Sequence, residues 1–307
     1  MPTGRAAAAE AGSVTVRSSW LFVPGDSEKK LAKGLESGAH ALILDLEDAV
    51  APGRKAFARG LVAEFIGSAG KAASAPELWV RINPLRSAEA LADIAAATCP
   101  GLAGIMLPKA EGRADPLLLG QHLDRAERMG GVAAGSVGIF PVATETARAV
   151  LLLSQYAEGP IPRLTALTWG AEDIAADIGA SANTDEHGVW FEAFRAARSM
   201  ALFAAHAAGA QAVETLHVDI RAEAALLAST RRARAEGFSG RIAIHPAQVP
   251  VINAAFTPSA DELERARAIV ALFAADPAVG TVAFEGKMLD RPHLVQARRI
   301  LAAAGEG

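Results

Sequence analysis

This sequence has a single cysteine, no predominant charge of one sign and no long apolar run. Cys99 is the only cysteine in 307 residues, so no disulfide can form within the chain, as is typical of proteins from reducing compartments. Charged residues interrupt the apolar stretches, and none approaches the roughly 20 residues that a membrane span needs. Residues 1–16 also lack the pattern of a secretory signal. We therefore expect a cytoplasmic protein without a membrane partner.

The balance of charges argues against a general attraction for nucleic acid. The chain carries 30 Lys and Arg against 34 Asp and Glu, which gives a formal net charge of −4. Proteins that bind the phosphate backbone through their overall field are normally basic. We expect no nucleic-acid partner, and any anionic ligand has to be held by local basic side chains.

Short apolar segments alternate with longer amphipathic segments about eight times along the chain. The short segments are nearly continuous in Leu, Ile and Val, as in parallel strands that are buried on both faces. The predicted strands are Trp20–Pro24, Ala41–Leu46, Leu78–Ile82, Gly104–Leu107, Val137–Val142, Leu164–Thr168, Glu214–Val218 and Ile242–Ile244. The predicted helices are Glu28–Ser37, Arg54–Phe65, Ala88–Ala97, Pro116–Met129, Ala147–Gln155, Phe191–Ala208, Ala222–Ala235 and Ala260–Ala274.

Eight repeats of a strand followed by a helix predict an α/β protein with a (β/α)8 TIM barrel. An open, doubly wound sheet is the alternative, but no dinucleotide-type GxGxxG follows a strand. We expect an N-terminal tail at residues 1–16 and a barrel domain at residues 17–276. Residues 277–307 exceed what the barrel needs and are expected to form a helical C-terminal extension.

Polar side chains follow nearly every predicted strand. In barrels of this type the reactive residues project from the carboxyl ends of the strands. The polar residues at these ends include Asp26, Asp45, Glu47, Asp48, Arg81, Asn83, Lys109, Glu145, Asp173, Asp219 and His245. A structural protein does not need this concentration of charge, so the strand ends predict a catalytic or binding site.

Glu145 and Asp173 follow the fifth and sixth predicted strands, which are neighbours around the barrel. Two carboxylates that converge in a pocket repel each other unless a cation or a proton lies between them. Two oxygen ligands, with positions left for water and substrate, suit Mg²⁺ or Mn²⁺. The alternative is that each residue caps the helix that follows it.

Two basic side chains and a group of acids complete the predicted site. A guanidinium at Arg81 is suited to bind a carboxylate or to stabilise an enolate oxygen, although an ion pair with a neighbouring acid is the alternative. Lys109 could serve the same substrate-binding pocket. Period-two alternation turns Asp45 and Glu47 to one side of the second strand and Asp48 to the other. These acids could orient Arg81, Lys109 or metal-bound water, or they could only balance the charge around the site. We expect Asp45 to balance charge, and for Glu47 these roles and substrate binding stay open.

The segments at the strand ends, taken together, resemble the citrate lyase β-subunit family, which includes citryl-CoA lyases, malyl-CoA lyases and malyl-CoA thioesterases. The resemblance extends roughly from Arg17 to Ile300 in the family's order. The segments are Ser19–Asp26, Leu44–Val50, Val80–Asn83, Leu107–Lys109, Glu145–Arg148, Gly170–Asp173 and Ala243–Gln248. Several ordered motifs are a far more specific signal than any one of them.

The resemblance implies roles for individual residues. Glu145 and Asp173 would be the Mg²⁺ ligands, and Arg81 with Glu145 would contact an acyl-CoA substrate. Gly286–Leu294 also resembles the closing segment of the family, in whose malyl-CoA members an aspartate from a neighbouring subunit acts at the methyl carbon of acetyl-CoA. Asp290 is the matching position. The resemblance also implies the oligomeric state of the family, a homotrimer or hexamer, and it allows partner subunits of a citrate lyase complex.

The expected activity is cleavage of a carbon–carbon bond in a 3-hydroxyacyl-CoA, with Arg81 at the enolate oxygen and Asp290 at its carbon. A malyl-CoA thioesterase on the same scaffold is the nearest alternative. A pyruvate-type aldolase that does not use CoA is a second one, and a non-catalytic subunit of a citrate lyase complex is a third.

Overall fold

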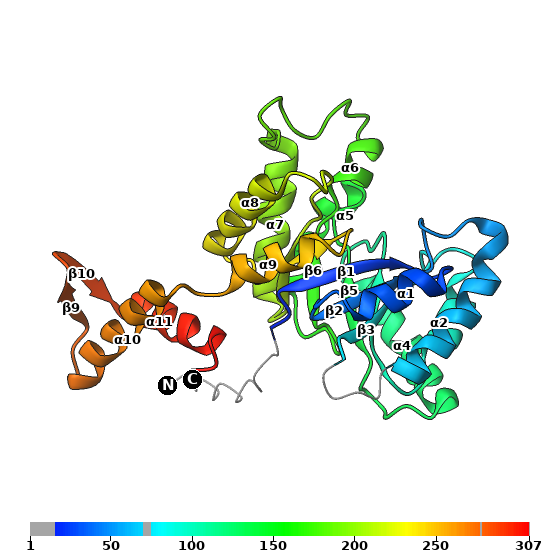
Figure 1. Ribbon diagram of the computed structural model, residues 1–307, viewed down its shortest axis with the longest axis horizontal. Helices are drawn as coiled ribbons and strands as arrows, with labels where there is room; N and C mark the ends of the chain where they lie inside the picture. Colours follow the sequence, from blue (N-terminus) through cyan, green and yellow to red (C-terminus); the bar gives the residue numbers. More distant parts are fainter. Residues whose placement is uncertain (1–15, 70–74, 277, 307) are drawn as a thin grey trace, which may run out of the picture. The chain divides into compact units, whose positions relative to one another are not determined.

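The computed structural model describes residues 16–69, 75–276 and 278–306 (Figure 1). The chain divides into two compact units, one that ends at Ile252 and one that begins at Asn253. Of the predicted N-terminal tail, only Val16 lies within the described residues. The predicted domain limits, 17–276 and 277–307, differ from this division and stay a prediction.

The first unit is built on eight parallel strands. They are β1 (Ser19–Pro24), β2 (Ala41–Asp45), β3 (Glu77–Arg81), β4 (Leu102–Leu107), β5 (Gly138–Pro141), β6 (Ala166–Thr168), β7 (Gln211–Glu214) and β8 (Gly240–Ala243). Their order in the sheet is β5-β4-β3-β2-β1-β8-β7-β6. Parallel bridges from Ile139 to Leu164 and from Val142 to Thr168 join the two end strands. The sheet is therefore a nearly closed barrel, which confirms the predicted fold class.

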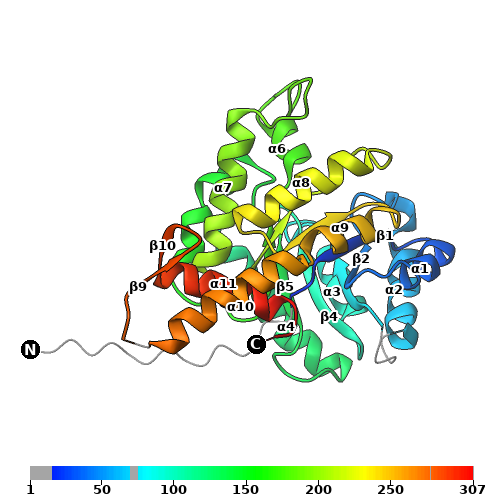
Figure 2. The same cartoon turned by 60° about the vertical axis from the view of Figure 1, so that its left-hand side comes forward.

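Helices follow the strands and lie around them in both views (Figures 1 and 2). They are α1 (Glu28–Leu35), η1 (Pro52–Arg54), α2 (Lys55–Ala69), α3 (Ala90–Ala97), α4 (Ala114–Gly130), α5 (Ala147–Leu151), η2 (Leu153–Ala157), α6 (Ala171–Asp177), α7 (Glu192–Ala207), α8 (Glu223–Glu236) and α9 (Gln248–Phe256). The sequence analysis missed α9. Pro250 obscures its helical pattern, yet proline is tolerated in the first turn of a helix, where its missing N–H has no partner to lose.

The interior of the barrel is filled by aromatic rings over glycines. Trp20 lies with its ring centroid 5.2 Å from that of Trp79 and 4.6 Å from that of Phe140. A Cβ on Gly104 would overlap the Trp79 ring, and a Cβ on Gly138 would lie 2.8 Å from it. Gly104 on β4 and Gly138 on β5 therefore make room for the Trp79 ring of β3.

One strand was predicted in the wrong place. The expected seventh strand, Glu214–Val218, lies for the most part in the loop after β7, which runs from Gln211 to Glu214. The helix before it, α7, ends at Ala207, and Gly209 with a φ of 68° terminates it. Because the chain turns there, β7 begins at Gln211, three residues earlier than the apolar pattern suggested. Glu214, rather than Asp219, is the residue at the carboxyl end of this strand.

The second unit is helical with a small hairpin. It contains α10 (Ala260–Ala275), β9 (Thr281–Phe284), β10 (Lys287–Asp290) and α11 (Arg291–Ala303). Apolar side chains of α10 and α11, among them Phe273 and Leu301, form its core. The antiparallel pair β9–β10, which the sequence analysis did not predict, turns at Glu285 and Gly286, both with positive φ. Over the described residues, no helix has the length and apolar character that crossing a membrane requires.

Candidate active site

Arg81 ends β3 inside the mouth of the barrel, where Asp45 of β2 fixes it. Its Nε and Nη2 donate to the two carboxylate oxygens of Asp45 at 2.8 and 2.7 Å, and the ring centroid of Phe22 lies 4.6 Å from the guanidinium carbon. Burial works against the charge, but Asp45 and Glu47 outweigh it and raise the pKa of Arg81. The ion pair that was the alternative for Arg81 is present, and it leaves Nη1 turned toward Glu47.

Glu47 lies between the two basic side chains of the mouth. It is buried, and its Oε1 accepts a hydrogen bond of 2.9 Å from Lys109 Nζ. Its Oε2 lies 3.0 Å from Arg81 Nη1 as an ion pair, without the geometry of a hydrogen bond. Burial raises the pKa of Glu47, although both cations oppose the shift. Asp48 is largely exposed and 3.8 Å from Arg81. Because β2 ends at Asp45, Glu47 and Asp48 lie in the turn that follows it, and the period-two alternation predicted for the three acids does not apply to them.

Lys109, which follows β4, connects three acids that follow β2, β5 and β6. Its φ of 50° is in the left-handed region, and this turn aims the main-chain N–H at Glu145 Oε2, to which it donates. The ammonium group lies 2.9 Å from Glu47 Oε1 and 3.5 Å from Asp173 Oδ1. Burial disfavours the ammonium charge, but Glu47 outweighs it and raises the pKa of Lys109. One residue thus brings together both predicted metal ligands.

Glu145 is a buried carboxylate without a full counter-charge. Its exposed fraction is 4%, and burial, reinforced by repulsion from Asp173 and Glu47, raises its pKa to about 8. It does not cap the helix that follows, because the Thr146 side chain accepts the hydrogen bond from Ala149 N in that position. The helix-cap alternative for Glu145 is therefore wrong.

Asp173 lies in the first turn of α6, where its side chain is 36% exposed. Gly170 occupies the N-cap position, and a Cβ there would lie 3.0 Å from Glu145 Cγ. The glycine therefore allows the α6 turn to approach Glu145. Asp173 faces Lys109 rather than serving as the cap of its own helix.

The charges of this cluster do not balance. Its carboxylates belong to Asp45, Glu47, Glu145 and Asp173, and its cations to Arg81 and Lys109. Two carboxylates in excess would be neutralised by one divalent cation. Among the described residues, no group of three or more His, Cys, Asp and Glu side chains could hold a metal unaided. A pair of carboxylates that leaves positions for water and substrate fits Mg²⁺, which usually binds protein through one or two carboxylates.

Lys55 supports the site and was missed by the sequence analysis. It opens α2, and its Nζ donates to the carbonyl oxygens of Leu46 and Glu47 and to Asn83 Oδ1, at 2.7 to 2.8 Å. Three acceptors around one ammonium group fix the loop that carries Glu47. A lysine in the first turn of a helix, where basic residues are disfavoured, was the available signal.

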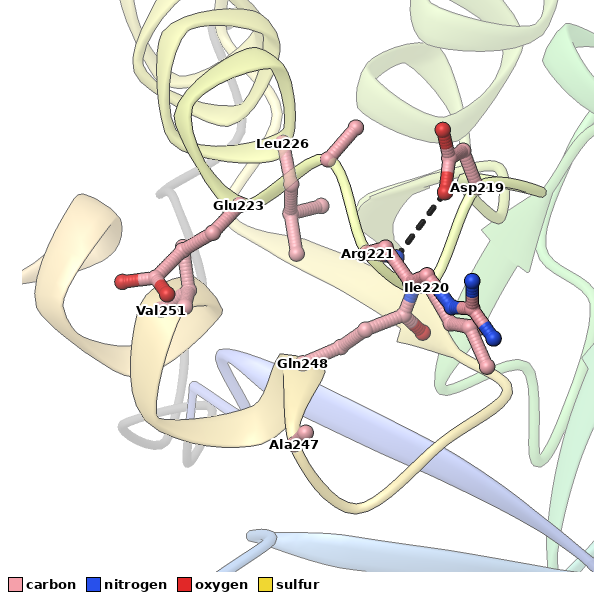
Figure 3. A pocket seen from close by; sticks show the side chains of 9 residues that line it. Asp219, Ile220, Arg221, Glu223, Leu226, Ala247, Gln248 and Val251 are labelled. Carbon is pink, nitrogen blue, oxygen red and sulfur yellow. Dashed lines mark hydrogen bonds between the residues drawn. The ribbon is translucent and has the colours of Figure 1, made fainter.

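Several other predicted positions lie apart from the cluster. His245 fixes its own loop, since its Nδ1 accepts from Ala247 N at 3.2 Å. Arg17 pairs with Glu77 at the start of β3, at the end of the barrel opposite the mouth. Asp219 borders a small pocket of about 70 Å³, in which Gln248 points toward the loop before α8 (Figure 3).

Asp290 lies in the second unit, at the N-cap of α11. Its side chain is 52% exposed, and its Oδ1 lies 2.5 Å from His293 Nδ1. Asp290 and His293 form a capping box, in which the Asp290 side chain accepts from the main-chain N–H of His293 and the Asp290 main-chain N–H donates to His293 Nδ1 at 3.2 Å. The close contact with the imidazole was not predicted.

Two family models match this chain. The model described as HpcH/HpaI aldolase/citrate lyase matches residues 18–246, and so covers all eight barrel strands. A model described as a C–C bond lyase of the TIM-barrel fold matches residues 188–305. The second match includes Asp290 and the helix that follows it.

Individual relatives match over nearly the whole chain. A citrate lyase subunit beta-like protein of Mycobacterium tuberculosis is 34% identical over 287 residues, covering 94% of this chain and 95% of the relative. Mitochondrial citramalyl-CoA lyase of Rattus norvegicus is 32% identical over 301 residues, covering 94% and 86%. The solved structure of CitE from Mycobacterium tuberculosis in complex with magnesium, acetoacetate and coenzyme A has a TM-score of 0.79 and 32% identity, covering 95% of this chain and 99% of the other.

Proposed function

Because the chain belongs to the HpcH/HpaI aldolase/citrate lyase family, we propose that it is a Mg²⁺-dependent lyase that cleaves a carbon–carbon bond of a 3-hydroxyacyl-CoA. The products would be acetyl-CoA and a 2-keto acid. The observation that carries the proposal is the convergence of Glu145 and Asp173 on Lys109, beside an immobilised Arg81. Relatives that are citramalyl-CoA lyases, or structures with magnesium and coenzyme A, support it.

Glu145 and Asp173 are the residues that would hold Mg²⁺, with Mn²⁺ as a substitute of the same ligand preference. Bound there, the ion would supply Lewis-acid polarisation of the hydroxyl and carboxylate oxygens of the substrate. Lys109 keeps the two carboxylates oriented through its main-chain N–H and its ammonium group. The two acids come from adjacent strands, so they can hold an ion without rearranging the barrel.

Arg81 would bind the negative oxygen of the substrate. Asp45 occupies two of its nitrogens, and the stacking of Phe22 fixes the plane of the guanidinium. The group therefore needs no reorganisation when charge develops at an enolate or carboxylate oxygen. Glu47 and Lys109 would line the same pocket, where the ammonium group contributes a second positive charge to an anionic substrate.

Asp290 would exchange a proton with the carbon of the acetyl-CoA enolate. In the cleavage direction it protonates this carbon, and in the reverse direction it removes the proton. We propose that it serves the barrel of a neighbouring copy in a homotrimer or hexamer, as the family resemblance implies. Partner subunits of a citrate lyase complex, and a reducing cytoplasmic location suited to the single Cys99, belong to the same proposal.

The test is to incubate the pure protein and Mg²⁺ with citryl-CoA, malyl-CoA, β-methylmalyl-CoA and citramalyl-CoA, and to identify the products by mass spectrometry. Acetyl-CoA (propionyl-CoA from the β-methyl substrate) with a 2-keto acid is the expected result. Free CoA with a hydroxy diacid would instead indicate the thioesterase.

Matched variants test whether the side chains of this site are required for cleavage. Asp173→Asn should abolish cleavage, whereas Asp48→Asn, a change of the same kind at an exposed acid of the same mouth, should leave it intact. Lack of turnover with all four thioesters would contradict the proposed lyase and favour a non-catalytic subunit.

A further inference from the structure

The C-terminal unit contains a close pair of ionisable side chains. Asp290 ends β10, and His293 stands in the first turn of α11, three residues later. Side chains three residues apart face each other across a helix turn. Here Asp290 Oδ1 and His293 Nδ1 are 2.5 Å apart, a distance typical of a strong hydrogen bond that involves a charged group.

A hydrogen must lie between these two atoms for the contact to be attractive. The Asp290 main-chain N–H donates to the same Nδ1 at 3.2 Å, so the imidazole presents its lone pair on this side. In one arrangement the shared proton is on Asp290 Oδ1, and the neutral ring carries its own hydrogen on Nε2. The alternative arrangement, with the proton on Nδ1, differs only by a shift of that proton over a short distance.

A capping role alone does not account for histidine at this position. In a capping box the third helical residue is usually Glu or Gln, whose side chain bonds back to the N-cap N–H. His293 makes this bond, but it also adds an imidazole ring, whose two nitrogens can accept and donate a proton. Both side chains are about half exposed, with fractions of 52% for Asp290 and 46% for His293. The pair can therefore exchange its proton with water.

We propose that His293 is the positioning and proton-sharing partner of Asp290, an inference that rests on the proposed function of Asp290. In the cleavage direction the O–H bond of Asp290 breaks as the C–H bond forms at the enolate carbon, which leaves a carboxylate. The pair then regains one proton from water at the exposed imidazole. In the reverse direction Asp290 takes the proton from the methyl carbon, and it passes through His293 to water.

His293→Gln tests this role against a capping role, because Gln retains the bond to the N-cap N–H. We expect kcat for malyl-CoA cleavage to fall by about 10-fold or more with KM nearly unchanged, since His293 acts through Asp290 and not on the substrate. The melting temperature should stay at the wild-type value. His293→Ala should lose activity similarly and regain part of it in added imidazole, which can enter the space left by the ring.

Wild-type kcat in His293→Gln, with no effect of imidazole on His293→Ala, would overturn the proposal and leave His293 as a cap. Asp290→Asn tests the proposed function of Asp290 separately from the role of His293. If this variant retains turnover, the proposed function of Asp290 is wrong.

A measurement that needs no turnover covers the case of an inactive enzyme. The ¹⁵N chemical shift of His293 Nδ1 should change in Asp290→Asn, because the carboxyl partner is lost and only the main-chain N–H bond to Nδ1 remains. Identical ring shifts in the two proteins would exclude a shared proton.

Discussion

Two buried glutamates at opposite ends of the barrel have opposite electrostatics. Glu127, in the last turn of α4, pairs with Arg163 through both carboxylate oxygens at 2.6 and 2.7 Å and accepts from the N–H groups of Gly135 and Val137. Burial opposes its charge, but these partners outweigh it and lower the pKa of Glu127 to about 2. For Glu145 at the mouth, burial raises the pKa to about 8. The difference lies in the partners and not in the residue type.

The comparison separates stability from chemistry. At the end where the strands begin, Arg163 matches the charge of Glu127 and also contacts Asp124, so the cluster holds α4 against the loop before β6. At the mouth, acidic side chains outnumber basic ones. The protein itself therefore provides too few positive charges to balance this cluster. An excess of negative charge at a buried site lowers the stability of the folded protein. Such a cost is expected at the functional site of a barrel of this kind.

Removing the Glu145 carboxylate should have the largest effect. Glu145→Gln deletes one proposed metal ligand, and we expect kcat to fall by about 1000-fold or more. Its thermal stability should equal or exceed that of the wild type, because a neutral amide replaces a buried carboxyl group whose charged form is disfavoured there. Steady-state kinetics measure the expected fall in kcat, and a thermal melt measures the stability of the variant. A clear drop in melting temperature would show that Glu145 contributes to stability as Glu127 does.

The same substitution at the other end should give the reverse result. Glu127→Gln leaves Arg163 without its bidentate partner, and we expect the free energy of unfolding to fall by about 3 kcal/mol. The kcat of the folded enzyme should not change. Urea unfolding followed by activity assays at low temperature makes the comparison. If Glu127→Gln has the stability of the wild type, or if it loses kcat without losing stability, the assignment of stability to one end of the barrel and chemistry to the other is wrong.

Replacing Arg81 should give a smaller loss at the mouth. Arg81→Lys retains the positive charge but cannot bind Asp45 through two parallel hydrogen bonds. We expect kcat/KM to decrease by about 30-fold to 100-fold through loss of orientation. Lys55→Arg, which changes a neighbouring base without touching the guanidinium, is the control. Equal losses in the two variants would indicate a general disturbance of the loop after β2.

The pH dependence of stability should be the smallest effect. Since the folded pKa of Glu127, about 2, lies below its value of 4.5 in the unfolded chain, the stabilisation is fully present above pH 4.5 and is lost as the pH falls toward 2. At pH 3.5 the loss should be about 1.4 kcal/mol. The difference in unfolding free energy between the wild type and Glu127→Gln isolates this group. A difference that does not narrow below pH 4.5 would contradict the assigned pKa.

The sequence predicted those parts of the molecule that follow from local patterns. Seven of the eight predicted apolar segments coincide with strands of the barrel. The polar residues Arg81, Lys109, Glu145 and Asp173 could be predicted to lie near one another, because parallel strands bring their carboxyl ends to one mouth. The C-terminal hairpin was missed because strands β9 and β10 are short and mostly exposed, with no continuous apolar run.

Other features depend on contacts that a linear pattern does not encode. The three acceptors of Lys55 come from two different strand ends, so no spacing in the sequence indicates them. Gly170 resembles an ordinary loop glycine until the approach of Glu145 is seen. The proximity of His293 to Asp290 is compatible with a simple helix cap, and only the 2.5 Å distance distinguishes it.

The central claim is that Glu145 and Asp173 jointly bind one divalent cation at the barrel mouth. Calorimetric titration of the wild type, Glu145→Gln, Asp173→Asn and Asp48→Asn with Mg²⁺ tests it most directly. We predict one site per chain in the wild type and in Asp48→Asn, and no measurable binding in the other two. Unchanged Mg²⁺ binding in Glu145→Gln and Asp173→Asn would contradict it.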